Sequence, residues 1–133
     1  KVQGYVRLNG TSDIQWEDNL DFSVYPNLRF YDYTKITGRN VQNIPNYKLT
    51  YSRSEDTSND ELLFSISNGN NVAVVFDTLP ETYLNIPVIN GDLNDLRWLD
   101  PDGVIVGLKA KGKAVKSTSE QDKGFVIRLK TIE

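Results

Sequence analysis

Short segments in which apolar and polar residues alternate recur along this chain, and they constrain its fold more than any other feature. The longest covers residues 104–113, where one set of alternate positions is apolar and the other set carries lysines. Successive side chains of a strand point to opposite faces, so a period of two indicates a β-strand. We expect strands in residues 2–8, 14–25, 28–33, 47–52, 62–66, 72–76, 104–113 and 125–130.

This pattern predicts an all-β protein. We expect an antiparallel β-sandwich or jelly roll of about eight or nine strands, with long loops and at most one short helical turn, and a closed barrel is the second choice. The helical turn is expected in residues 92–99, where leucines recur every three positions. The length of 133 residues fits a single β-sandwich domain over residues 1–133.

The clearest local prediction is a β-hairpin. Residues 62–66 and 72–76 both alternate, and Asn68, Gly69, Asn70 and Asn71 separate them. Asn-Gly pairs favour the tight turns that join antiparallel strands. We therefore expect these two segments to pair with each other.

The composition argues against several classes of function. The chain has no Cys, His or Met, so a thiolate nucleophile, an imidazole base and the usual Cys/His zinc site are all excluded. A hydrolase that uses two carboxylates remains a third hypothesis, but no spacing singles out a pair. No apolar run approaches the roughly 20 residues that span a bilayer. We expect a protein that is not an enzyme and does not insert into membranes.

Charge is distributed unevenly along the chain. Residues 1–104 carry a net charge of -7 and residues 105–133 carry +4. Lys109, Lys111 and Lys113 form a predicted basic face, which either keeps a strand soluble or complements an acidic neighbour. No aromatic side chain alternates with these lysines, so we expect no nucleic-acid partner.

Two motifs in this region suggest sites and also have simpler explanations. Gly107, Gly112 and Lys113 match the spacing of a phosphate-binding loop, but Ala114 follows and the segment alternates as a strand, so a bend or a close backbone approach explains the glycines better. Asp100 and Asp102 flank a Pro in a turn sequence and could bind calcium through oxygen ligands. Calcium is therefore a possible ligand of this turn, and no other cofactor is expected.

Aromatic residues are numerous in this chain, with seven Tyr, five Phe and two Trp, and they suggest a binding function. The five Phe fall in phase with the core, whereas Tyr25, Tyr31 and Tyr33 fall in the opposite phase, and Trp98 lies in a turn-like segment. Amphipathic rings of this kind often bind sugars or protein partners. The alternative to a binding role is that both faces of each strand are partly covered by the fold, so that these tyrosines only bridge the core and its rim. We predict ligand binding at Tyr25, Tyr31, Tyr33 and Trp98.

Small Cys-free, β-rich chains with many Asn, Thr and Tyr are typical of adhesin modules and of virion fibre or decoration domains. We therefore expect a non-catalytic structural and binding subunit of an extracellular, cell-surface or virion assembly. It would act through a protein partner or self-association. The alternative is a carbohydrate-binding module that stacks its exposed Tyr and Trp rings on a glycan.

Overall fold

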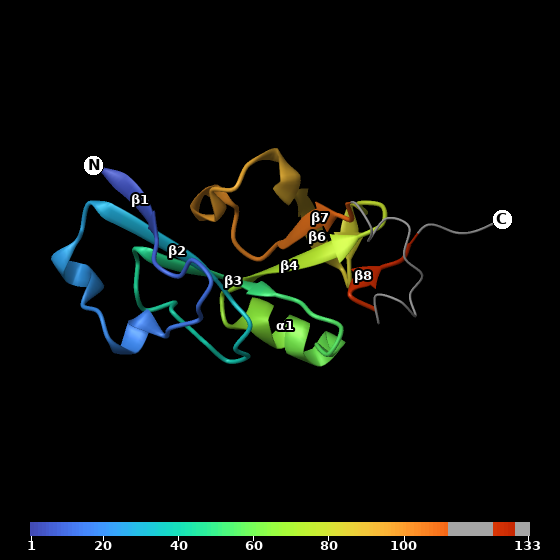
Figure 1. The fold of residues 1–133 in the computed structure, drawn as a ribbon, viewed down its shortest axis with the longest axis horizontal. Coiled ribbons are helices and arrows are strands. Elements are labelled where there is room, and N and C mark those ends of the chain that lie inside the picture. Colours follow the sequence, from blue (N-terminus) through green and yellow to red (C-terminus); the bar gives the residue numbers. More distant parts are fainter. Residues whose placement is uncertain (112–123, 130–133) are drawn as a thin grey trace.

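The computed structural model describes residues 1–111 and 124–129, and its eight described strands form one open sheet (Figure 1). The order across the sheet is β1-β2-β3-β4-β7-β6-β5, and β8 also pairs with β4. The strands are β1 (Gly4–Arg7), β2 (Leu28–Thr34), β3 (Tyr47–Ser52), β4 (Asn71–Phe76), β5 (Thr82–Tyr83), β6 (Ile86–Asn90), β7 (Ile105–Lys109) and β8 (Val126–Ile127).

One helix and four 3₁₀ turns accompany the described strands. They are α1 (Asn59–Ser67), η1 (Trp16–Asp18), η2 (Phe22–Val24), η3 (Gly91–Leu93) and η4 (Arg97–Leu99). The expected helical turn in residues 92–99 is thus seen as parts of η3 and η4. Residues 14–25, expected to be strand, instead contain η1 and η2.

The prediction of a protein built mostly from sheet is confirmed, but the antiparallel sandwich or jelly roll is not. Every strand pair is parallel except β5 with β6. A parallel pair needs a connection that returns to the starting end of the sheet. The long segments between β1, β2, β3 and β4, the last of which contains α1, supply that return, so they are crossovers and not the loops of a sandwich.

The predicted hairpin is wrong because residues 59–67 form α1. Ser58 caps this helix: its side chain accepts a hydrogen bond from the Glu61 backbone, and the Glu61 side chain accepts one from the Ser58 backbone. Gly69 follows the helix with a φ of +83°, a conformation that ends helices well. The Asn-Gly sequence therefore marks a helix end.

One face of the sheet, here called the connection face, carries the hydrophobic core. α1 lies on this side of the strands, whereas residues 91–103 lie on the other side (Figure 1). Two clusters of buried side chains fill the connection face. The first is Phe22, Phe30, Val41, Tyr47 and Leu49, and the second is Tyr51, Leu62, Val72, Val74, Phe76, Ile86 and Ile105.

The opposite face, here called the pocket face, is covered only in part. Asn71 on β4 holds the last part of residues 91–103 at the amino ends of the strands: its amide donates to Pro101 O and its carbonyl accepts from Val104 N. The first part lies at the carboxyl end of β7, where Asp92 accepts a hydrogen bond from Lys109 N. Arg97 is buried within this segment. The carboxyl ends of β1, β2 and β3 on the same face remain accessible.

The segment 104–113 is confirmed as a strand over Ile105–Lys109, but neither face of its first half is open to water. Ile105 and Val106 are both fully buried, as is typical of strands inside parallel sheets. Gly107 is buried too, and a Cβ there would lie 2.7 Å from Val88 Cγ1. Close packing explains this glycine, as the sequence suggested.

No helix in residues 1–111 and 124–129 is long and apolar enough to cross a bilayer.

Candidate functional site

The accessible part of the pocket face is hollowed into a pocket of about 630 Å³. It lies where β1, β2 and β3 end and over the middle of β4 and β7. Ligands of open parallel sheets bind outside the carboxyl ends of the strands, in pockets of roughly 300–1,000 Å³. Its described lining is Arg7, Asn9, Gly10, Thr11, Ser12, Asp13, Tyr33, Thr34, Lys35, Ser52, Arg53, Ser54, Glu55, Ala73, Val75, Leu108 and Phe125.

Side chains of neighbouring strands lie side by side and form the floor of the pocket. Ser52 on β3 pairs in register with Ala73 on β4. Val75 on β4 pairs in register with Leu108 on β7. Tyr33 and Phe125 add aromatic rings to the pocket lining. The floor is therefore mainly apolar.

Three cationic side chains line the pocket. Arg7 donates from Nε to Asn9 O at 3.1 Å and from Nη2 to Gly10 O at 3.4 Å, and its guanidinium lies over the Tyr33 ring. Arg53 donates from Nη1 to Gly124 O and Phe125 O at 3.0 and 2.8 Å. Lys35 is exposed. Within the described residues, none of these three cations forms an ion pair with a carboxylate.

Two carboxylates also line the pocket, and they differ in their surroundings. Asp13 Oδ1 lies 2.8 Å from Arg39 Nη1, and the same carboxylate accepts hydrogen bonds from Thr34 Oγ1 and Lys35 N. Its charge is therefore offset by a cation outside the pocket. Glu55 is exposed at the rim. The pocket thus retains an excess of positive charge.

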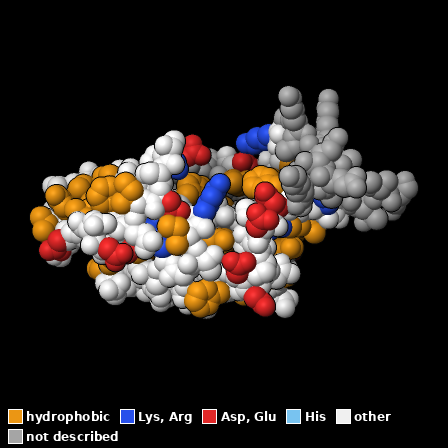
Figure 2. Space-filling model, turned by 60° about the horizontal axis from the view of Figure 1, so that its bottom comes forward, with side chains coloured by type: hydrophobic (Ala, Val, Ile, Leu, Met, Phe, Trp, Pro, Cys, Tyr) orange, Lys and Arg blue, Asp and Glu red, His pale blue; other side chains and the backbone are white. Residues whose placement is uncertain are grey.

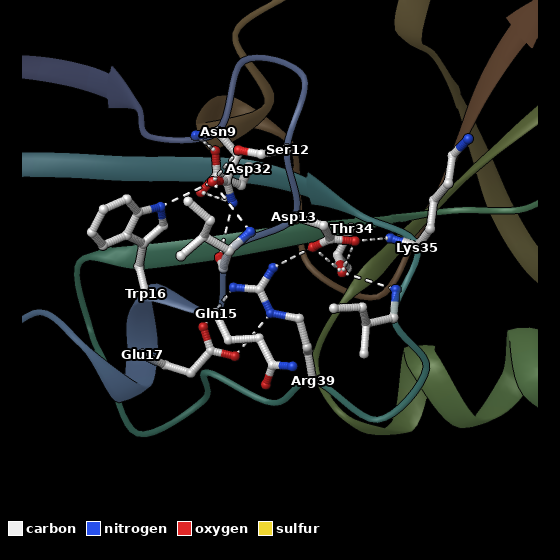
Figure 3. A network of polar contacts seen from close by, with 12 residues as sticks. Asn9, Ser12, Asp13, Gln15, Trp16, Glu17, Asp32, Thr34, Lys35 and Arg39 are labelled. Atoms are coloured by element: carbon white, nitrogen blue, oxygen red, sulfur yellow. Dashed lines mark hydrogen bonds and ion pairs between the residues drawn. The ribbon is translucent and has the colours of Figure 1, made fainter.

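A buried polar network holds the loop that follows β1, which forms one rim of the pocket (Figure 3). Asp32 is fully buried on β2, and its carboxylate accepts hydrogen bonds from Asn9 N at 2.7 Å and Tyr47 Oη at 2.7 Å. Asn9 Oδ1 in turn accepts from Trp16 Nε1 at 2.9 Å. Burial raises the pKa of the Asp32 carboxyl, although the hydrogen bonds from Tyr47 and Asn9 act in the opposite direction.

Arg39 anchors the other half of this network. Its side chain is fully buried and contacts Asp13 at 2.8 Å, Glu17 at 2.5 Å and Tyr47 Oη at 3.1 Å. Burial alone would lower the pKa of Arg39, but the hydrogen bonds to Glu17 and Tyr47 outweigh it and the pKa is raised. Burial and the bond to Asp32 likewise raise the pKa of Tyr47. The network fixes the loop after β1 to the end of β2.

The structure separates the four aromatic residues predicted to bind ligand. Tyr33 lines the pocket. Tyr31 is half-buried two positions earlier on the same face, and Tyr25 is exposed with its ring 6.2 Å from that of Phe30. Trp98 lines a second pocket near the amino ends of the strands, and the Arg29 guanidinium lies 5.9 Å from its ring centroid. Glycan binding at Trp98 stays a prediction.

The predicted basic face and metal site also have defined surroundings. Lys109 is exposed, Lys111 pairs with Asp92 at 3.2 Å, and Lys113 lies outside the described residues. Asp100 lies 3.3 Å from Arg97, and Asp102 lies 3.3 Å from Lys48. In the part of the chain that the structure describes, no three acidic side chains gather as metal ligands.

Several pocket residues were not predicted from the sequence, namely Arg7, Lys35, Arg53 and the buried Asn9, Asp32 and Arg39. A usable signal was present: a basic residue ends or directly follows β1, β2 and β3. In an antiparallel arrangement, consecutive strand ends lie at opposite edges. Only parallel strands bring these three ends together.

The chain matches the model of a known protein family. The family described as gene product 88, GP88, matches residues 1–129. No curated protein and no solved structure shows a significant match to the chain. Because the family match covers nearly the whole chain, the protein belongs to the gene product 88 (GP88) family, a phage-type family.

Proposed function

We propose that the pocket binds a small oxyanion, such as a phosphate or carboxylate group. The observation that carries this proposal is the set of three pocket cations, Arg7, Lys35 and Arg53, none of which pairs with a carboxylate in the described residues. In the part of the chain that the structure describes, Arg7 and Arg53 donate hydrogen bonds to neutral backbone carbonyls, and Arg7 lies over the Tyr33 ring. Guanidinium groups held in this way keep their charge available for an anion.

Hydroxyl groups in the pocket give the proposal further support. Thr11, Ser12, Ser52 and Ser54 also line the pocket, and hydroxyls donate readily to oxyanions. The proposal concerns binding without catalysis, because the chain contains neither His, the commonest general base, nor Cys, the most reactive nucleophile.

Titration with inorganic phosphate, followed by calorimetry or NMR, tests the proposal. Replacing Arg7 or Arg53 by Gln should weaken binding by about tenfold or more, because a charge-assisted hydrogen bond contributes roughly 1.5–3 kcal/mol. Arg29→Gln is a matched control, since Arg29 also bonds to backbone carbonyls and lies over a ring but is outside the pocket. Absence of phosphate binding, or equal loss in all three variants, would refute the proposal.

A second candidate function, self-association in a surface or virion assembly, is favoured by the apolar edge of the sheet. Val2, Tyr5, Val24 and Tyr25 are exposed around β1 and η2. Figure 2 shows hydrophobic side chains at the end of the molecule where β1 begins. Unpaired strand edges and exposed apolar side chains favour pairing with another chain. Membership of a phage-type family is consistent with a virion location.

Light scattering over a range of protein concentrations tests this second candidate. We expect dimers or larger species that become monomers in Tyr5→Ser and Val24→Ser. Leu99→Ser is the control, because Leu99 is 60% exposed but lies in η4, away from the β1 edge. A strict monomer at high concentration would contradict the assembly hypothesis.

A further inference from the structure

The proposed oxyanion leaves most of the pocket unexplained. The cations come from the strand ends and the following residues, and Arg53 Nη1 lies 2.8 Å from Phe125 O, so the charged groups adjoin the floor. The floor, formed mainly by Ala73, Val75, Leu108 and Phe125, is apolar. A volume of about 630 Å³ is of the size that holds whole organic ligands. A bare ion would leave this apolar floor in contact with water.

From this division we infer, resting on the proposed function, that the ligand is a phosphate monoester whose organic part is planar and apolar. The phosphate lies against Arg7, Arg53 and Lys35, and the organic part covers the floor. The inference thus names a ligand class for the same pocket.

The shape of the floor favours a planar group. Tyr33 and Phe125 contribute rings to the pocket lining, and Phe125 is 39% exposed. Aromatic rings pair with other rings in offset or edge-to-face geometry and gain energy beyond simple burial. Ala73 in the same lining has only a methyl side chain, which leaves room for a ring above it.

The charge of the pocket favours a phosphate monoester over a carboxylate. Three cations surround the polar side, and two of them are arginines, whose planar forks match the oxygens of phosphate. A carboxylate carries a single negative charge, whereas a phosphate monoester carries close to two at neutral pH. The dianion therefore matches the three cations more closely.

Calorimetric titrations of the whole chain with inorganic phosphate, phenyl phosphate and phenol test this inference. We expect phenyl phosphate to bind about tenfold more tightly than phosphate, since covering a ring removes apolar surface from water. Phenol, which lacks the anion, should bind far more weakly than either. Benzoate, with one negative charge, should bind more weakly than phenyl phosphate.

Two variants of floor residues test whether the tighter binding of phenyl phosphate depends on this floor. Leu108→Ala and Phe125→Ser should lower the affinity for phenyl phosphate severalfold more than the affinity for inorganic phosphate. Phe125 is the safer position, because an exposed side chain can be replaced without disturbing the core. Leu99→Ala, outside the pocket, should change neither affinity.

The outcomes separate this inference from the proposed function. If phosphate binds and phenyl phosphate binds no more tightly, the planar organic part is refuted and the oxyanion site stands. If neither ligand binds, both proposals fail. If phenyl phosphate binds more tightly but the floor variants have no effect, the assignment to this floor is refuted.

Discussion

The guanidinium of Arg7 lies 5.1 Å from the centroid of the Tyr33 ring. Arg7 ends β1 and Tyr33 is the penultimate residue of β2, so the contact joins two parallel strands at the mouth of the pocket. Burial raises the pKa of the Tyr33 hydroxyl, although Arg97 and Arg7 act to lower it. The Tyr33 hydroxyl is therefore neutral at pH 7. The face of its ring holds the Arg7 guanidinium through a cation–π contact.

This contact predicts a graded effect of two substitutions at Tyr33. Tyr33→Phe keeps the ring and should retain the affinity for phosphate. Tyr33→Leu removes the cation–π contact, which is worth about 0.5–1 kcal/mol at an accessible site, and should weaken phosphate binding about two- to fivefold. Calorimetric titration measures both. Equal affinity in Tyr33→Leu and the natural protein would show that the ring does not position Arg7.

Removing the buried cation of the network should destabilise the fold. In Arg39→Met, Asp13 and Glu17 lose their partner while remaining partly buried. We expect the free energy of unfolding in denaturant to fall by about 3 kcal/mol, at the lower end for a buried ion pair because both carboxylates keep some solvent contact.

Lys111→Gln is the control for this measurement. Its ion pair with Asp92 involves a lysine side chain that is 74% exposed, and such pairs contribute about 0–1 kcal/mol. A loss for Arg39→Met as small as that for Lys111→Gln would contradict a structural role of the network.

The raised pKa of Asp32 makes stability depend on pH. The folded protein holds this proton above the ordinary value of 3.8, so between that value and the higher folded pKa the folded state binds more protons than the unfolded state. The contribution of Asp32 to stability therefore falls as pH rises through this window.

Asp32→Asn should remove this dependence, because an amide does not titrate. Denaturant unfolding at several pH values from about 3 to 7 measures the difference between the two proteins. We expect the stability of the natural protein relative to Asp32→Asn to decline with rising pH across the lower part of this range. A constant difference would contradict the raised pKa.

The capping box of α1 gives a test of the helix that replaced the predicted hairpin. Ser58→Ala removes the side-chain acceptor for Glu61 N and should lower the free energy of unfolding by about 0.5–2 kcal/mol. The Ser58 backbone N–H, and after it the Ser58 side chain, lower the pKa of Glu61. Ser58→Ala keeps the backbone hydrogen bond and removes the side-chain one, so the titration of Glu61 in NMR should move part of the way toward the ordinary value. Ser67→Ala, at the far end of the helix, should leave that titration unchanged. No change of Glu61 in Ser58→Ala would argue against the cap.

Calcium should leave the melting temperature unchanged. Arg97 and Lys48 already lie beside the carboxylates of Asp100 and Asp102. Burial raises the pKa of the Asp100 carboxyl, against the lowering effect of Arg97 and Lys48. Thermal unfolding at millimolar calcium measures the effect. A rise in the melting temperature that is abolished in Asp100→Asn/Asp102→Asn would establish the metal site instead.

Local pattern located most strands correctly but wrongly predicted strands in residues 14–25 and 62–66. Leu62, Phe64 and Ile66 alternate as a strand would, while Leu62 and Ile66 also share one face of a helix. The structure buries Leu62 and leaves Phe64 half exposed. Ser58 and Glu61, at capping-box spacing, were the local signal for the helix.

The sequence by itself determined that the chain is rich in strands, where most of them lie, and that a basic residue stands at the end of three of them. The tertiary structure decided that these strands run parallel, because alternation of side chains is the same for either direction. It decided too that Tyr33 belongs to the pocket while Tyr25, Tyr31 and Trp98 do not. The reason is that Arg7, Lys35 and Arg53 are far apart in the chain and meet only where crossovers return β1, β2 and β3 in the same direction.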